Sequence, residues 1–231
     1  MVEKISLCIP TYNRLDLLKR SFENVLMDER ICEIVIVDDH SDTAIFQKVH
    51  ALGDLPKVKV YRNPENLGVY GNKKRAIELA TYEWCILFDS DNVIDTDYID
   101  TIYSQTWDEG TILAPSFAKP HFDYRAYAGQ TWTKLNIANE IGKAGVDCCL
   151  NTMNFFVNRS RFLSVWQQHD NIKGADSIYF NYLWLLAGNA FHVVPNLEYF
   201  HLVHDGSYYV SVAYESAPKS KEIENLLKRM R

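Results

Sequence analysis

Apolar positions in the first hundred residues alternate between two spacings along the chain. Residues 33–37 (EIVIV) contain a continuous β-branched run, which is typical of a strand buried on both faces. Residues 16–27 instead carry apolar side chains at helical spacing. By the same criteria we expect strands at 4–9, 33–37, 58–61 and 84–88, and helices at 16–27, 44–52 and 72–80. Strands alternating with helices predict right-handed βαβ units and a parallel sheet that helices cover on both faces.

The pattern loosens beyond residue 97, and residues 117–133 form an irregular aromatic stretch. The expected strands there are 112–115, 152–157, 192–194 and 197–202, and the expected helices are 98–106, 159–168, 177–187 and 219–231. No internal repeat, low-complexity segment or linker separates these parts of the sequence. We therefore expect a single α/β domain over residues 1–231, with a mostly parallel central sheet and helices on both faces.

Composition narrows the classes of function. The 231 residues carry 24 Lys and Arg against 30 Asp and Glu, a net charge of −6. This argues against a nucleic-acid-binding surface, which needs basic patches. The 5 cysteines show no metal-ligand spacing, which predicts free thiols in a reducing cytosol. The first residues lack the features of a signal peptide, and no run approaches the roughly 18 apolar residues of a membrane span. We expect a cytoplasmic protein.

Polar clusters follow three of the expected strands at the point where each strand ends. They are residues 10–14 (PTYNR), 38–42 (DDHSD) and 89–92 (DSDN). In open parallel sheets a ligand binds outside the carboxyl ends of the strands. One such cluster is often only the start of the next helix, but three at one edge indicate a binding site.

Asp89 and Asp91 are the most informative pair in these clusters. Two carboxylates two residues apart in extended backbone face the same side and can share one cation. Hard oxygen ligands suit Mg²⁺ or Mn²⁺, which usually keep water and substrate phosphates as their other ligands. The same DSDN sequence is also a good turn, and the residues alone leave both interpretations open. The sequence lacks both G-x-G-x-x-G and the P-loop motif, which excludes common dinucleotide- and NTP-binding sites.

Several motifs fall in an order that matches a known family. They are IPTYNR (9–14), IVIVDDHSD (34–42), N-x-G (66–68), FDSD (88–91), RSRF (159–162), GADS (174–177) and HDGS (204–207). Together they resemble an inverting glycosyltransferase of the family 2 type, with a GT-A fold and a nucleotide-diphospho-sugar donor. The resemblance implies a nucleotide-sugar-binding half (1–97), an acceptor-binding and catalytic half (98–210) and a C-terminal helical tail (211–231).

The resemblance also implies roles for individual residues. Those expected to contact the nucleotide sugar are Pro10, Thr11, Tyr12, Arg14, Asp38, Asp39, Asn66, Gly68, Lys73, Asp89 and Ser90. In this assignment Asp39 accepts a hydrogen bond from the base or ribose, and Lys73 stands where the family often has Arg. Asp91, Asp89 and His204 are expected to hold Mn²⁺ or Mg²⁺ on the diphosphate.

Asp176 matches the catalytic base of the family. In an inverting displacement, a carboxylate within hydrogen-bond reach of the acceptor hydroxyl removes its proton as the new bond forms. An alternative is that Asp176 only caps the helix that begins near Ser177. Two features depart from the family: Ala175 replaces the usual acid before this Asp, and the chain lacks the C-terminal extension of many relatives.

The expected partners are a nucleotide-diphospho-sugar, by analogy a UDP-sugar, and a glycan or lipid-linked glycan acceptor, as in polysaccharide or cell-surface glycan synthesis. The charged helix at 219–231 is expected to dock on the body of the protein, or to contact an anionic membrane surface from outside. Two alternative functions remain at this point. A nucleotidyltransferase would normally show a glycine-rich basic loop after the first strand, and a non-catalytic nucleotide-sugar-binding module is favoured only by Ala175.

Overall fold

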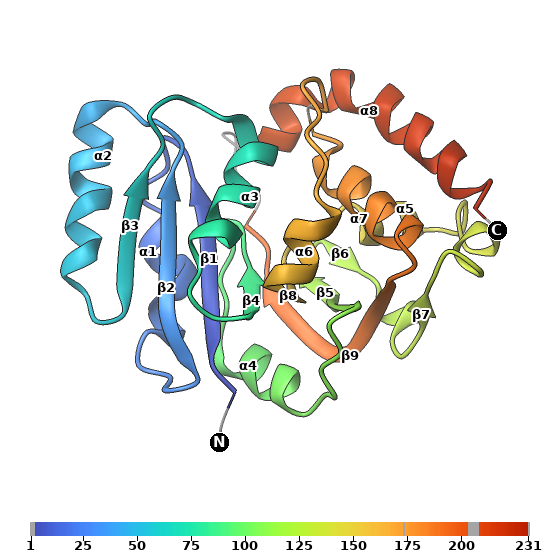
Figure 1. The fold of residues 1–231 in the computed structure, drawn as a ribbon, viewed down its shortest axis with the longest axis horizontal. Helices are drawn as coiled ribbons and strands as arrows, with labels where there is room; N and C mark the ends of the chain where they lie inside the picture. The colour runs from blue at the N-terminus through green and yellow to red at the C-terminus, as the bar shows by residue number, and fades with distance from the viewer. Residues whose placement is uncertain (1–2, 173, 203–207, 231) are drawn as a thin grey trace.

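The chain folds around one mixed sheet, seen in a computed structural model that describes residues 3–172, 174–202 and 208–230 (Figure 1). The sheet has nine strands in the order β3-β2-β1-β4-β8-β5-β9-β7, with β6 paired to β5. The strands are β1 (Ile5–Thr11), β2 (Ile31–Asp38), β3 (Val58–Arg62), β4 (Trp84–Leu87), β5 (Thr111–Lys119), β6 (Phe122–Asp123), β7 (Thr131–Trp132), β8 (Phe155–Asn158) and β9 (Ala190–Phe200).

The predicted parallel unit forms one side of this sheet. Strands β3, β2, β1 and β4 run parallel, and Thr11 of β1 lies level with Asp38 of β2. The carboxyl ends of β1, β2 and β3 therefore meet at the upper edge of the sheet in Figure 1. Strand β8 is antiparallel to both β4 and β5, whereas β5 and β9 are parallel. The α/β fold class and the single central sheet are confirmed, with a mixed second half.

Helices cover both faces of the sheet. They are α1 (Leu18–Phe22), α2 (Thr43–His50), α3 (Gly68–Leu79), α4 (Thr96–Tyr103), α5 (Val146–Leu150), α6 (Arg159–Val165), α7 (Asp176–Leu186) and α8 (Tyr208–Leu227). Buried residues of α3, α5, α6 and α7 share one apolar core with β1, β4 and β8. Those of α1 and α4 share a second core on the other face. The β-branched residues of β2 divide between these two cores, which explains the continuous apolar run in its sequence.

Several expected elements differ from the observed ones. The helix expected at 16–27 is the short α1 followed by a 3₁₀ turn, Glu23–Val25. The strands expected at 192–194 and 197–202 are one strand, β9, whose pairing with β5 shifts register between Pro115 and Phe117. This irregularity interrupts the alternation of apolar and polar side chains, so the sequence predicts two strands where the structure has one.

The C-terminal helix also begins earlier than expected, because α8 continues through Pro218. Its apolar residues Ile223 and Leu227 are buried in the same core as α7, so this helix docks on the body as predicted. All five cysteines are free, as predicted. Among the described residues, no helix is long and apolar enough to cross a membrane.

Candidate active site

The loops after β1 and β2 are locked to each other at the carboxyl edge of the sheet. The backbone N–H of Asn13 donates to Ser41 Oγ (2.8 Å), and that of Asp42 donates to Asn13 Oδ1 (2.9 Å). Asn13 adopts a left-handed conformation (φ 47°), which asparagine tolerates better than most residues. These bonds fix the chain directly after Tyr12, a residue that is 50% exposed at this edge.

Asp38 and Asp39 are adjacent at the end of β2 but have different surroundings. Asp38 is fully buried, and its Oδ2 accepts a hydrogen bond from the Ser41 N–H (2.9 Å) and lies 3.6 Å from Arg62 Nε. The described residues offer no hydrogen bond to its buried Oδ1. Asp38 therefore holds the loop through Ser41 from a buried position.

Asp39 organises the segment that leads into α3. Its Oδ1 accepts hydrogen bonds from Asn63 Nδ2 and the Leu67 N–H, both at 2.8 Å. Asn66 Nδ2 donates to the Asp39 carbonyl (3.0 Å), and the Gly68 N–H donates to Asn66 Oδ1 (3.0 Å). Burial raises the pKa of Asp39 in spite of these bonds. Both of these bonds use Oδ1, so Oδ2 can accept a hydrogen bond from a ligand.

Asn66 and Gly68, both predicted from the N-x-G motif, thus hold the loop that surrounds Asp39 in its conformation. Gly68 has a left-handed backbone (φ 73°), which glycine adopts at little cost. Asn63 and Asn72 were not predicted: Asn63 Nδ2 also donates to Asn72 Oδ1 (2.9 Å), and Asn72 Nδ2 donates to the Val37 carbonyl (3.0 Å). Both asparagines are buried, and they tie α3 to the ends of β1 and β2.

Asp89 is held by a residue from another part of the chain. Asn154 Oδ1 accepts from the Asp89 N–H (2.7 Å), and Asn154 Nδ2 donates to Asp89 Oδ2 (2.9 Å). Burial raises the pKa of Asp89, but the nearby Lys73, Asn154 and Arg14 lower it by more. The pKa of this carboxyl therefore lies below its ordinary value. Asn154 was not predicted, because it precedes β8 and no local motif marks it.

Lys73 connects Asp89 to Asp176. Its ammonium Nζ lies 3.0 Å from Asp176 Oδ2, 3.5 Å from Asp89 Oδ1 and 3.5 Å from Ser177 Oγ. Lys73 is 4% and Asp176 is 6% exposed. Burial lowers the pKa of Lys73, but the two carboxylates raise it above its usual value, so the lysine is charged. One ammonium thus pairs with two acids that lie 87 residues apart in the sequence.

Asp176 is the first residue of α7 and does not act as its N-cap. The N-cap is Ala175, which supplies no side-chain hydrogen bond to the helix. The interpretation of Asp176 as a helix cap is therefore wrong. A cavity of about 110 Å³ opens beside this residue, between the start of α3 and the segment before α7. Its lining includes Gly68, Tyr70, His169 and Asp176.

Arg14 and Asp91 form an ion pair at the same edge, with 2.8 Å between Nη1 and Oδ2. Ser90, between the two acids of the DSD segment, is buried, as is Thr11 at the end of β1. Pro10 lies one residue before, within β1. His204, the third expected metal ligand, lies outside the described residues. Within the described ranges, no group of three or more His, Cys, Asp or Glu side chains is placed to hold a metal ion.

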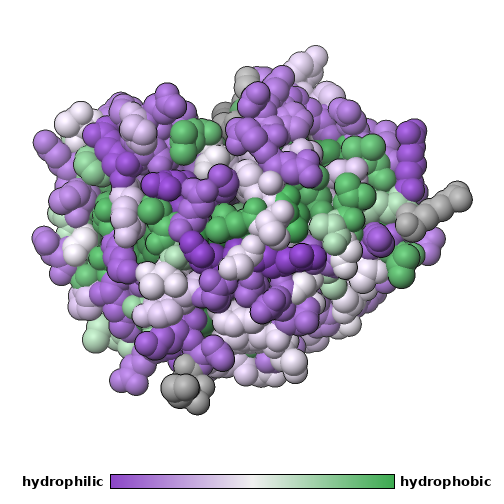
Figure 2. Space-filling view, viewed as in Figure 1, coloured by the Kyte–Doolittle hydropathy of each residue, from purple (hydrophilic) through white to green (hydrophobic). Residues whose placement is uncertain are grey.

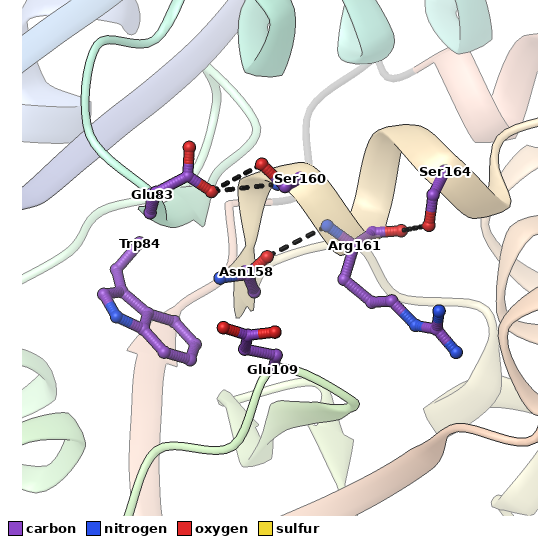
Figure 3. Close-up of a pocket in the computed structure, with 7 residues that line it drawn as sticks. All are labelled: Glu83, Trp84, Glu109, Asn158, Ser160, Arg161 and Ser164. Atoms are coloured by element: carbon purple, nitrogen blue, oxygen red, sulfur yellow. Dashed lines mark hydrogen bonds between the residues drawn. The ribbon is translucent and has the colours of Figure 1, made fainter.

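The surface is hollowed at this upper edge, between the lobe of α2 and β3 and the lobe of α7 and α8, and its rim is mostly hydrophilic (Figure 2). A larger cavity, about 530 Å³, lies elsewhere (Figure 3). It is bounded by Trp84, which begins β4, and by Asn158, which ends β8. Asp89 follows the opposite end of β4, so this cavity is not part of the candidate site.

The sequence and structure match proteins of one family. The model of the family described as "Glycosyl transferase family 2" matches residues 6–162. An uncharacterized glycosyltransferase, MG060, from Mycoplasma genitalium is 25% identical over 206 residues, which cover 82% of this chain and 66% of that protein. The chain thus spans just under two thirds of the length of this relative.

Two solved structures share the fold. S. aureus TarS 1–349 in complex with UDP-GlcNAc superimposes with a TM-score of 0.71 at 20% identity, covering 97% of this chain and 65% of TarS 1–349. The mannosyltransferase PcManGT from Pyrobaculum calidifontis, in complex with GDP-Man and Mn²⁺, has a TM-score of 0.65 at 16% identity and covers 98% of this chain and 69% of its own. The fold is therefore of the GT-A type. Since the family model matches more than half of its residues, this chain belongs to glycosyl transferase family 2.

Proposed function

We propose that this protein transfers a sugar, with inversion, from a nucleotide-diphospho-sugar to a hydroxyl of a glycan or lipid-linked glycan. The observation that carries this proposal is the meeting of Asp39, Asp89, Asp91 and Asp176 at one edge of the sheet. They come from three separate segments of the chain and are held there by Asn63, Asn154, Lys73 and Arg14.

The donor nucleotide is proposed to bind over the ends of β1 and β2. Asp39 Oδ2 is available to accept from an N–H of the base or a ribose hydroxyl, and the half-exposed ring of Tyr12 is available to pack on the base. The complexes of TarS with UDP-GlcNAc and of PcManGT with GDP-Man support a nucleotide-diphospho-sugar as the class of donor. We favour a UDP-sugar because the TarS structure gives the higher TM-score.

The donor set fits Mg²⁺ or Mn²⁺. Asp89 and Asp91 offer carboxylate oxygens, the ligands these hard cations prefer, and both lie at the edge where a diphosphate would sit. Asp91 would bind the metal and Asp89 would bind it or its water, with His204 as a further expected ligand. When bound, the metal supplies positive charge that stabilises the diphosphate leaving group. The Mn²⁺ in the PcManGT complex supports this assignment.

Asp176 is proposed to act as the base. An acceptor hydroxyl oxygen attacks the anomeric carbon, the bond from that carbon to the diphosphate oxygen breaks, and the hydroxyl proton passes to the Asp176 carboxylate. Lys73 and the first turn of α7 hold this carboxylate in place. The cavity beside Asp176, with Tyr70 and His169 in its lining, is the proposed position of the acceptor.

Calorimetric titration of UDP, GDP and dTDP tests the proposal, first with Mn²⁺ and then with EDTA. We expect one nucleotide to bind with Mn²⁺ and to lose most of its affinity with EDTA. Asp91→Asn should lose the same metal-dependent part of the affinity, since it removes a carboxylate that would bind the cation. If none of the three nucleotides binds to folded protein, the transferase proposal is wrong.

A further inference from the structure

A cationic side chain already forms an ion pair with one of the two carboxylates that are proposed to bind the metal. Arg14 Nη1 lies 2.8 Å from Asp91 Oδ2, across 77 residues of sequence. The two side chains are only 22% and 14% exposed, so solvent screens this ion pair less than it would at an open surface. The Asp89 carboxylate shares the ammonium of Lys73 with Asp176. In this state each acid of the DSD segment lies beside a basic side chain of the protein itself.

The backbone that carries Arg14 is fixed, and its side chain is the part that can move. The preceding Asn13 is bonded to the β2 loop through its backbone N–H and its side-chain Oδ1, and Thr11 Oγ1 donates to the Arg14 carbonyl (3.3 Å). The guanidinium reaches Asp91 from this anchored position at the edge where the nucleotide is proposed to bind. A guanidinium fits phosphate oxygens as well as it fits a carboxylate.

A divalent cation and a guanidinium cannot share the Asp91 carboxylate without strong repulsion between them. We propose that Arg14 competes with the divalent metal for Asp91 in the donor-free protein, and moves to the diphosphate when metal and nucleotide bind together. The inference rests on the proposed function, because it takes Asp91 as a metal ligand. It assigns Arg14 a second task beyond contact with the nucleotide: it sets the affinity for the metal.

This exchange couples the two ligands. The nucleotide draws Arg14 away from Asp91 and so raises the affinity for the metal, and by linkage the metal raises the affinity for the nucleotide by the same factor. Without nucleotide, the metal must displace Arg14 from Asp91 with no diphosphate present to bind the guanidinium. The wild-type protein should therefore bind metal weakly alone and much more tightly with a nucleoside diphosphate.

Electron paramagnetic resonance of free Mn²⁺ measures this coupling directly, in titrations with and without UDP or GDP. Arg14→Gln removes the competing charge, so we expect Mn²⁺ to bind the nucleotide-free variant about tenfold more tightly than wild type, within the range typical of coupled sites. The enhancement of Mn²⁺ binding by nucleotide should fall by a similar factor. Arg75→Gln is the matched control, because it removes one positive charge from an exposed ion pair with Glu78 and should leave both values unchanged.

The outcomes separate the inference from the proposed function. If wild type binds no Mn²⁺ even with nucleotide, the metal-dependent function itself is wrong. If wild type binds Mn²⁺ with nucleotide but Arg14→Gln does not bind it more tightly alone, only the exchange by Arg14 is wrong. Circular dichroism checks the fold of each variant. Arg14→Lys, which keeps the competing charge, should bind nucleotide-free Mn²⁺ less tightly than Arg14→Gln does, and an affinity equal to that of Arg14→Gln would show that the charge on Arg14 does not compete with the metal.

Discussion

Acidic residues at the two edges of the parallel part of the sheet lie in contrasting surroundings. Glu33, near the amino end of β2, is 2% exposed, and both of its carboxylate oxygens are fully used. Oε1 accepts from Ser6 Oγ (2.6 Å) and the Thr81 N–H (2.5 Å), and Oε2 accepts from Lys59 Nζ (2.5 Å) and Thr81 Oγ1 (2.9 Å). These partners lie on β1, on β3 and just before β4, so one carboxylate ties together the strands of the parallel unit.

At the carboxyl edge of the sheet the acids are held in a different way. The hydrogen bonds from Asn63 and Leu67 to Asp39 use only its Oδ1, and Asp91 is paired with an arginine that lies at the edge of the sheet. Asp89 and Asp176 share one lysine. A buried acid whose bonds are all made within the fold stabilises it, whereas acids with a remaining oxygen or an exchangeable cation can bind a ligand. Acidic residues thus stabilise the fold at the amino edge of the sheet, and at the carboxyl edge they are proposed to bind a ligand.

The largest effect should come from Asp176→Asn. Asparagine keeps an acceptor for Lys73 but is a far weaker base, so we expect kcat for sugar transfer to fall about 10³-fold. Donor affinity by calorimetry should stay within a few-fold of wild type, measured at a temperature where the variant is fully folded. Near-normal turnover by this variant would show that another group takes the proton.

Glu33→Gln should have the largest effect on stability. The glutamine amide would place a donor against the Lys59 ammonium or the Thr81 N–H, so we expect a loss of about 2 kcal/mol in the free energy of unfolding by urea. Glu29→Gln is the matched control on the same side of β2, because Glu29 is exposed, and its effect should stay within about 0.5 kcal/mol. Equal effects of the two variants would show that the Glu33 network adds no stability.

The smallest expected effect is a pH dependence of the difference in unfolding free energy between wild type and Glu33→Gln. Burial raises the pKa of Glu33, but Lys59, Ser6 and Thr81 lower it by more, so the folded value lies below the ordinary glutamate value of 4.5. A lowered carboxyl pKa contributes stability above pH 4.5 that is lost as the pH falls through the folded pKa. The stability gap between wild type and Glu33→Gln should therefore narrow below pH 4.5 and stay constant between pH 6 and 8. A gap that widens in acid would contradict this sign.

The sequence predicts the parts of the molecule that depend on nearby residues. Strands β1 to β4 and the acids that follow β2 and β4 were predicted because apolar runs and strand ends are local features. Partners far away in sequence were not. Asn154 lies 65 residues from Asp89, and Lys73 lies 103 residues from Asp176. Glu33 was read only as part of a strand, because nothing near it in sequence marks its three partners.

The most direct test of the contrast between the two edges of the sheet is a calorimetric titration in the presence of Mn²⁺. The nucleotide among UDP, GDP and dTDP that binds wild type is titrated into Asp39→Asn and Glu33→Gln side by side. Asp39→Asn should lose at least tenfold in affinity, because its side chain can present a donor where the base or ribose requires an acceptor. Glu33→Gln, although less stable, should bind within twofold of wild type at a temperature where it is fully folded. Normal affinity in Asp39→Asn, or an equal loss in both variants, would contradict the assignment of the carboxyl edge as the donor site.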